Sequence, residues 1–254
     1  MEFIKCDRDD HLLIATLARG KANALNSAMV EELTAVVTDA AASGEVRGVV
    51  LASDRPKFFS SGFDVVEVFQ YDRERMTTFF GRFIDLYEKM LRLPKPLVAA
   101  VSGHAYAGGA FLALACDARV MAEGAFGFAL NEINLGMTLP PGMIRLAIQA
   151  VGVRSGWDVV VGGKTLSPAR ALETGLAAEV VAPEEVLECA KARARELAEK
   201  PPLAFGVIKQ QFLEVTGHHP TGNDREWLPL FIEHWFSAEC MQRKEALIQS
   251  MRHH

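Results

Sequence analysis

The sequence predicts an α/β protein, and three apolar runs carry the prediction. The runs "RGVVLAS", "LVAAVSG" and "DARVMAE" have the length and composition of strands buried on both faces; they occupy 47–53, 97–103 and 117–123. Between and after them lie longer segments whose apolar residues recur at helical spacing. Because strand and helix patterns alternate along most of the chain, we expect a largely parallel sheet covered by helices.

The first half of the chain contains the predicted strands and helices in the following order. Residues 1–19 predict two short strands joined by a turn at Asp9 and Asp10. A helix is predicted over 24–43, with Asn26 as its N-terminal cap. After the first buried strand and a polar turn, 66–93 predicts one long amphipathic helix. The prolines that follow this segment end the helix.

The second half continues the alternation and then changes character. An apolar helix follows the second buried strand, and a further helix over 143–152 is predicted to end at Gly152. From Ser167 two helices flank the strand 177–181. After residue 200 helical patterns follow one another with no strand between them. We therefore expect two regions, an α/β core over 1–200 and a C-terminal helical region over 201–254.

Composition and charge exclude several classes of protein. With 27 basic and 32 acidic residues the net charge is −5, which argues against a broad nucleic-acid-binding surface. The four cysteines form no CxxC pair and no metal-ligand spacing, so we expect free thiols in a reducing compartment. The chain opens directly into strand-like sequence, and its apolar runs are too short to span a bilayer. The sequence predicts a cytoplasmic protein with no membrane partner and no metal site.

Two loops share one construction, an apolar strand followed by a glycine turn and a helix start. They cover 49–68 and 97–114. Glycine lets the backbone approach a ligand closely, and a helix start leaves amide N–H groups unpaired. Two such groups directed at one oxygen would stabilise developing negative charge. On pattern alone both loops could equally be ordinary strand-to-helix turns, and neither matches the dinucleotide fingerprint or the P-loop.

Four motifs in order resemble one family. "ANALN" at 22–26, "FFSSGFD" at 58–64, "GHAYAGGAFLALACD" at 103–117 and "NEINLGM" at 131–137 resemble the crotonase (enoyl-CoA hydratase/isomerase) superfamily. The resemblance implies a crotonase-like ββα spiral core, C-terminal helices used in trimerisation, and acyl-CoA thioester substrates. It also implies a homotrimer or a dimer of trimers, and no cofactor, because coenzyme A is part of the substrate.

The resemblance assigns roles to residues at matching positions. It places the two amides that hold the thioester oxygen on Phe63 and Gly108. Asp64 is also suited to cap the helix that follows it. The positions expected to lie along the substrate are Lys21, Ala22, Ala24, Ser61, Gly62 and Asp64.

The number of carboxylates favours one reaction within the family. Family members that hydrate enoyl-CoA generally use two glutamates; the first position holds Phe111 here, and the second holds Glu132. A single base can shift a double bond, and burial near Phe111 should raise the pKa of Glu132. With Asn131 beside the acyl group, the loop resembles the enoyl-CoA isomerase branch. Hydration, thioester hydrolysis, carbon–carbon bond chemistry and a catalytically idle acyl-CoA-binding or RNA-binding role remain alternatives.

Overall fold

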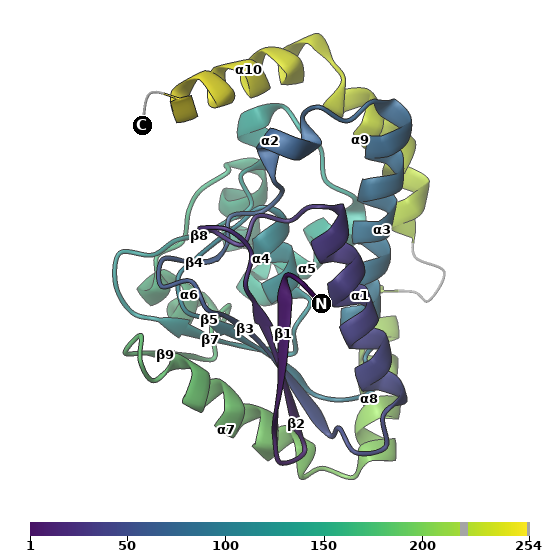
Figure 1. Ribbon diagram of the computed structural model, residues 1–254, viewed down its shortest axis with the longest axis vertical. Helices are drawn as coiled ribbons and strands as arrows, with labels where there is room; N and C mark the ends of the chain where they lie inside the picture. Colours follow the sequence, from purple (N-terminus) through teal and green to yellow (C-terminus); the bar gives the residue numbers. More distant parts are fainter. Residues whose placement is uncertain (219–222, 253–254) are drawn as a thin grey trace.

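The computed structural model of the protein describes residues 1–218 and 223–252 (Figure 1). Its main sheet has six strands, and only the first pair is antiparallel. Their spatial order is β1 (Ile4–Asp9), β2 (Leu12–Leu17), β3 (Gly48–Ser53), β5 (Leu97–Val101), β7 (Ala118–Ala122) and β9 (Glu179–Val181). The predicted α/β class is correct, and so are the three buried strands.

Alternation along the central strands divides the core between two faces of the sheet. Val50 and Val98 face α7 (Val186–Ala198), whereas Val49 and Leu51 belong to the larger core on the opposite face. That larger core also contains the buried sides of α1 (Ser27–Ala42) and α3 (Arg73–Leu91), which pack against each other. Figure 1 shows α7 on one side of the sheet and these two helices on the other. Burial on both faces explains the continuous apolar runs.

A second, three-stranded parallel sheet follows the ends of the main strands. It pairs β4 (Phe58–Ser60), β6 (His104–Tyr106) and β8 (Phe128–Ala129). Each of these strands comes directly after a strand of the main sheet and leads to a helix, so the chain repeats a strand–strand–helix unit three times. After β6 the helix is α4 (Gly108–Leu114), every residue of which is buried. The repeat is the ββα core expected from the resemblance.

The prediction of one helix over 66–93 is wrong. The chain forms the short α2 (Val65–Val68), breaks, and resumes as α3. The break occurs because Asp72 has extended backbone angles and its side chain accepts a hydrogen bond from the N–H of Arg75, capping a new helix start. At the other predicted cap, Asn26 accepts from the N–H of Met29 as expected.

The predicted helix end at Gly152 is correct only as a kink. Helix α5 (Pro141–Gly156) has non-helical angles at Gly152, φ 76° and ψ 162°, and then continues. A π-helical turn, η2 (Trp157–Val161), follows it. Glycine breaks the hydrogen-bond ladder there, but the residues after it again form helical turns.

The remaining elements are helical, apart from β9. Helix α6 (Pro168–Thr174) and α7 flank β9 as predicted, and after residue 200 come α8 (Pro202–Val215), η3 (Asn223–Trp227), α9 (Leu228–Trp235) and α10 (Ala238–Arg252). Helix α9 packs on α3 through stacked rings of Phe80 and Phe231, whose centroids are 3.6 Å apart. Over the described residues, no helix combines the length and apolar character needed to cross a membrane.

Candidate active site

Two segments far apart in the sequence run side by side at the edge of the small sheet. The N–H of Ser61 donates to the carbonyl of Ala22 at 2.9 Å, and the N–H of Leu25 donates to the carbonyl of Gly62 at 2.7 Å. In the next hydrogen bond between the two segments, the N–H of Asp64 donates to the carbonyl of Leu25 at 2.8 Å. These bonds fix the loop before α2 against the loop before α1. The residues predicted to lie along the substrate therefore come together.

The glycine turn before α2 packs directly against the start of α4. Gly62 has φ +89°, and a β-carbon there would lie 2.8 Å from the carbonyl oxygen of Tyr106 and 3.3 Å from the nitrogen of Gly108. Ala107, immediately before Gly108, has φ 48° and ψ −123°, a conformation that residues other than glycine rarely adopt. The Gly62–Phe63 peptide and the Gly108 amide therefore lie next to each other in a strained turn.

Both predicted amides are free to bind a ligand. In the part of the chain that the structure describes, neither the N–H of Phe63 nor that of Gly108 donates a backbone hydrogen bond. Gly108 is the first residue of α4, where helical N–H groups have no intrahelical acceptor. Backbone N–H groups without acceptors are uncommon inside folded proteins; here Gly108 is buried and Phe63 is half-buried, so a ligand is a suitable partner. An oxygen that carries partial negative charge is such a partner.

A cavity of about 130 Å³, here called the central cavity, opens beside these amides. Six of the predicted site residues line it: Ser61, Phe63, Gly108, Phe111, Asn131 and Glu132. The rest of its lining is apolar: Val65, Phe69, Phe80, Phe83, Ala107, Leu135, Met137, Leu139, Met143, Phe231, Trp235 and Leu247.

Glu132 begins the turn η1 (Glu132–Leu135) and is 8% exposed. One of its carboxylate oxygens, Oε2, is buried without a hydrogen-bond partner among the described residues. Burial penalises the charged form and raises the pKa of Glu132 to about 7, which confirms the predicted direction. A carboxylate with a pKa near neutrality both accepts and returns a proton readily. The arrangement suits Glu132 to acid/base chemistry.

Phe111 lies in the wall of the central cavity with 1% of its surface exposed. The ring of Phe63 packs edge-to-face on Phe79 and Phe83, with 4.9 Å between centroids in both pairs. With these aromatic rings in its wall, the central cavity contains few polar side-chain atoms that could bind a water molecule. Among the described residues that line it, the cavity therefore presents one acidic group, and seven aromatic residues belong to its mainly apolar wall.

Five predicted residues lie outside the central cavity lining. Lys21 is exposed, and Ala22 and Ala24 are half-buried beside the Ser61 loop. Gly62 packs against the carbonyl of Tyr106 and the first residue of α4. Asp64 caps α2 by accepting from Val66 and Glu67, and it pairs with Arg19 at 2.8 Å, which supports the capping interpretation.

Sequence reasoning missed much of the aromatic wall. The sequence predicts Phe80 and Phe83 on or near one face of a helix, and it predicts that the C-terminal aromatics, Phe231 and Trp235 among them, pack either on the body or on a neighbouring subunit. The structure places all four in the lining of the central cavity. That they share one cavity depends on α9 folding back onto α3 from about 150 residues further along the chain. No spacing in the sequence encodes that contact.

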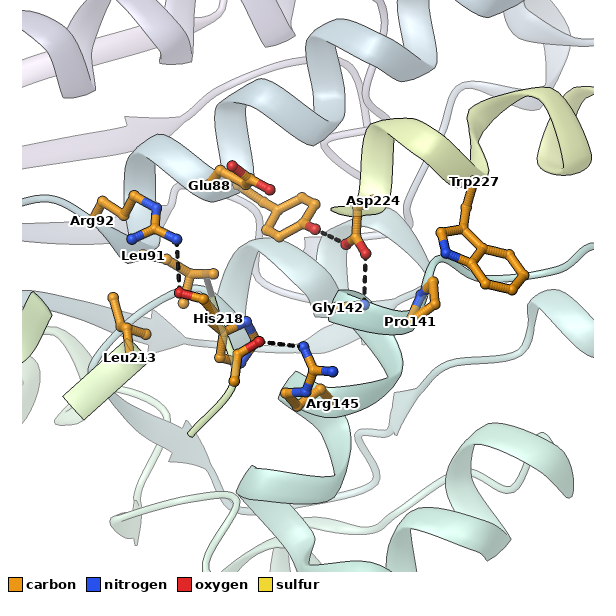
Figure 2. A pocket seen from close by; sticks show the side chains of 12 residues that line it. Glu88, Leu91, Arg92, Pro141, Gly142, Arg145, Leu213, His218, Asp224 and Trp227 are labelled. Carbon is orange, nitrogen blue, oxygen red and sulfur yellow. Dashed lines mark hydrogen bonds between the residues drawn. The ribbon is translucent and has the colours of Figure 1, made fainter. Parts of the chain in front are cut away.

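A buried carboxylate connects the C-terminal region to the start of α5. Asp224, which is 3% exposed, accepts from the N–H of Gly142 at 2.6 Å and from the hydroxyl of Tyr87, and the N–H of Met143 also bonds to it. Figure 2 shows Asp224 directly above Gly142, in a cavity that also contains His218 and Arg145. A β-carbon on residue 142 would collide with this carboxylate, so any larger residue there would displace the Asp224 side chain. Asp224 thus holds the first turn of α5, the helix that follows the Glu132 loop, through hydrogen bonds from two of its backbone N–H groups.

Comparison with known proteins places this site in a family. A sequence model described as enoyl-CoA hydratase/isomerase matches residues 8–226. The chain belongs to the enoyl-CoA hydratase/isomerase family. Membership makes it an acyl-CoA enzyme of the hydratase/isomerase class, with the crotonase fold that the motifs indicated.

Relatives within the enoyl-CoA hydratase/isomerase family carry different names. The 2,3-dehydroadipyl-CoA hydratase of Escherichia coli is 34% identical over 208 residues, covering 80% of this chain and 78% of that protein. A probable enoyl-CoA hydratase of Bacillus subtilis is 34% identical over 212 residues, covering 82% and 81%. The human mitochondrial delta3-delta2-enoyl-CoA isomerase superposes with a TM-score of 0.94 over 99% of this chain and 98% of that one. At 22% identity the last likeness shows the fold alone.

Proposed function

We propose that the protein is an enoyl-CoA isomerase that converts 3-enoyl-CoA to 2-enoyl-CoA. One observation carries the proposal. Among the described residues that line the central cavity, Glu132 is the one side chain that titrates near neutral pH. Moving a double bond needs one group that takes a proton and gives it back, whereas adding water also needs a second group to hold and orient the water.

In the proposed reaction the carboxylate of Glu132 removes a proton from C2 of the 3-enoyl-CoA. The electron pair of that C–H bond forms the C2–C3 double bond in a dienolate, and negative charge moves to the thioester oxygen. Glu132, now protonated, returns the proton to C4 as the charge moves back, so the double bond shifts from C3–C4 to C2–C3. No atom is gained or lost, and the carboxylate is regenerated.

The free amides of Phe63 and Gly108 are suited to hold the thioester oxygen while it carries charge. Their position against each other, fixed by Gly62, supports this role. Donors that are already in place strengthen as charge develops on the oxygen, which lowers the barrier without reorganisation. We extend the proposal to substrate contacts along 21–24 and 61–64, because Ser61 and Phe63 line the cavity and the segment 21–24 is hydrogen-bonded to this loop.

Hydration of 2-enoyl-CoA is the second candidate, because curated relatives bear hydratase names. The side chain at position 111 argues against it. Phe111 can neither orient nor deprotonate water, and its ring reduces the space and polarity that a water molecule needs.

Parallel assays separate the two candidates. Purified protein is incubated with 3-hexenoyl-CoA and with crotonyl-CoA, alongside Glu132→Gln. We expect isomerisation of 3-hexenoyl-CoA at a rate far above hydration of crotonyl-CoA, and loss of the isomerisation in the variant. Hydration of crotonyl-CoA without isomerisation would overturn the proposal, and equal turnover by parent and variant would favour an idle acyl-CoA-binding protein.

We also propose that 201–254 is an assembly region and that the protein forms a homotrimer, alone or paired into a hexamer. Three apolar residues at i, i+4 and i+7 spacing form a stripe along α8 that supports this: Ile208, Phe212 and Val215, each more than half exposed. Exposed apolar stripes of this kind mark surfaces that another chain covers. Light scattering should give the mass of three or six copies, and Phe212→Asp should lower it; a monomeric parent would refute the assembly.

A further inference from the structure

A second apolar hollow lies on the far side of the central cavity wall. This outer groove has a volume of about 630 Å³ and is formed between the Glu132 loop, η2 and the C-terminal helices. Its lining includes Ile133, Val161, Trp227 and Leu230, all of which are at least 36% exposed. An apolar surface of this kind, directly behind an acyl-CoA site, is chemically suited to a hydrocarbon chain.

Within residues 1–218 and 223–252, three side chains line both spaces: Met137, Leu139 and Phe231. This set, here called the partition, separates the central cavity from the outer groove within the described residues. Leu135 lines only the central cavity, and Ile144 lines only the groove. A chain extending from the thioester past Glu132 would meet the partition before it reached the groove.

The partition is held in place from three directions. The N–H of Met137 donates to the carbonyl of Glu132 at 3.1 Å, which ties the partition to the acidic residue itself. Phe231 is stacked on Phe80 of α3 at an interplanar angle of 8°. Leu139 lies two residues before α5, whose first turn is clamped by Asp224 through Gly142 and Met143 (Figure 2).

We propose that the partition ends the acyl pocket and sets the longest acyl chain that the enzyme binds well, and that Asp224 is a positioning residue that keeps the partition closed. The proposal rests on the acyl-CoA substrate of the proposed function, but it does not depend on which reaction follows. Each methylene in an apolar pocket contributes about tenfold or more to discrimination, so a wall at a fixed depth produces a sharp limit.

Affinities of saturated acyl-CoAs of about six to about sixteen carbons, measured by titration calorimetry, test the partition. For the parent we expect affinity to rise with each carbon and then stop rising once the pocket is filled. Leu139→Ala should remove that limit and bind the longest chains about tenfold or more tightly than the parent does. Ile144→Ala, which lies on the groove side and does not open the partition, should give no such gain.

Two results would overturn the partition. One is a parent whose affinity rises without a break through the longest chain. The other is the same long-chain gain in Ile144→Ala as in Leu139→Ala. Because saturated acyl-CoAs do not isomerise, a clear limit without isomerase activity would refute only the proposed function, and isomerisation without a limit would refute only the partition.

The role of Asp224 is tested on the same series. Asp224→Asn keeps an oxygen acceptor for the N–H of Gly142, whereas Asp224→Ala removes it. We expect the asparagine variant to retain the limit. The alanine variant should lose it and bind the longest chains about tenfold more tightly than the parent does. A folded Asp224→Ala protein with the chain-length profile of the parent would refute the positioning role. Should Asp224→Ala fail to fold, Gly142→Ala tests the role instead, because a β-carbon at residue 142 would displace the Asp224 carboxylate. Loss of the limit in Gly142→Ala supports the role, and a parent-like profile there refutes it.

Discussion

Glu132 is a carboxylate whose burial decides its chemistry. With a pKa of about 7, it is mostly protonated below neutral pH and mostly ionised above it. The base form starts the proposed reaction, so kcat/KM for isomerisation should rise with pH through about 7 and then level off. Glu132→Gln should lose about a thousandfold in kcat.

Glu88 provides the matched control for that pH profile. It is half-buried, and burial raises its pKa as well, but it lies outside the central cavity. Glu88→Gln should keep both the rate and the pH dependence of the parent. An unchanged pH profile in Glu132→Gln, or a shifted one in Glu88→Gln, would contradict the assignment.

Gly62 is the residue on which the amide pair depends. Because φ is +89° and the Tyr106 carbonyl oxygen would lie 2.8 Å from a β-carbon, alanine cannot fit without moving the Phe63 amide. Gly62→Ala should lower kcat by about a hundredfold, the loss expected for one misplaced donor. Gly44→Ala, where a β-carbon meets nothing within 4 Å, should have no effect on steady-state kinetics. A parent-like kcat in Gly62→Ala would remove the basis for the amide role.

At the residue scale, sequence reasoning placed six residues that do share the cavity, because all six belong to motifs that come after strand ends. It also gave the direction of the Glu132 pKa, since burial among apolar neighbours can be inferred from the residues around it. The strain at Ala107 could not be foreseen. Nothing about an alanine in sequence indicates a φ of 48°.

Asp72 controls an element boundary. Its side chain accepts from the N–H of Arg75 at 2.8 Å and starts α3, the helix that carries Phe80 and Phe83. Asp72→Ala should lower the free energy of unfolding by about 1 kcal/mol, as measured by urea denaturation. Thr78→Ala, an exposed change inside the same helix, should leave it nearly unchanged. Equal stability of the two variants would mean that the cap contributes nothing.

At the element scale, the strands and most helices followed from hydrophobic pattern, whereas one boundary did not. The apolar periodicity of 66–93 is continuous enough to predict a single helix, but the local hydrogen bond of Asp72 interrupts it. A similar conflict occurs at Gly152, where the backbone kinks yet helical turns continue. In both cases one residue's backbone geometry overrides a pattern averaged over many residues.

His218 links the stability of the whole molecule to pH. Burial, together with the nearby charges of Arg145 and Arg92, lowers its pKa to about 4. Its unfolded-state pKa is about 6.5, so the unfolded chain binds the proton more readily and stability falls as pH drops from about 6.5 toward about 4. The thermal midpoint should fall more steeply over this range in the parent than in His218→Gln. Identical slopes would show that His218 does not contribute.

At the scale of the whole molecule, the central cavity was the feature least accessible from sequence. Its wall combines α3 with Phe231, Trp235 and Leu247 of the C-terminal helices, which meet only when the chain folds back. The resemblance indicated what the C-terminal region does in the family, and the aromatic content indicated that it packs somewhere. Neither could say that it closes the central cavity.

Isotope transfer tests the central claim that one carboxylate both removes and returns the proton. The substrate is 3-hexenoyl-CoA carrying deuterium in place of both C2 hydrogens, converted in ordinary water and analysed by NMR. Because Glu132 is only 8% exposed, its exchange with solvent should be slow enough that part of the product carries deuterium at C4. A product whose C4 hydrogen comes entirely from solvent would contradict a single shuttling carboxylate.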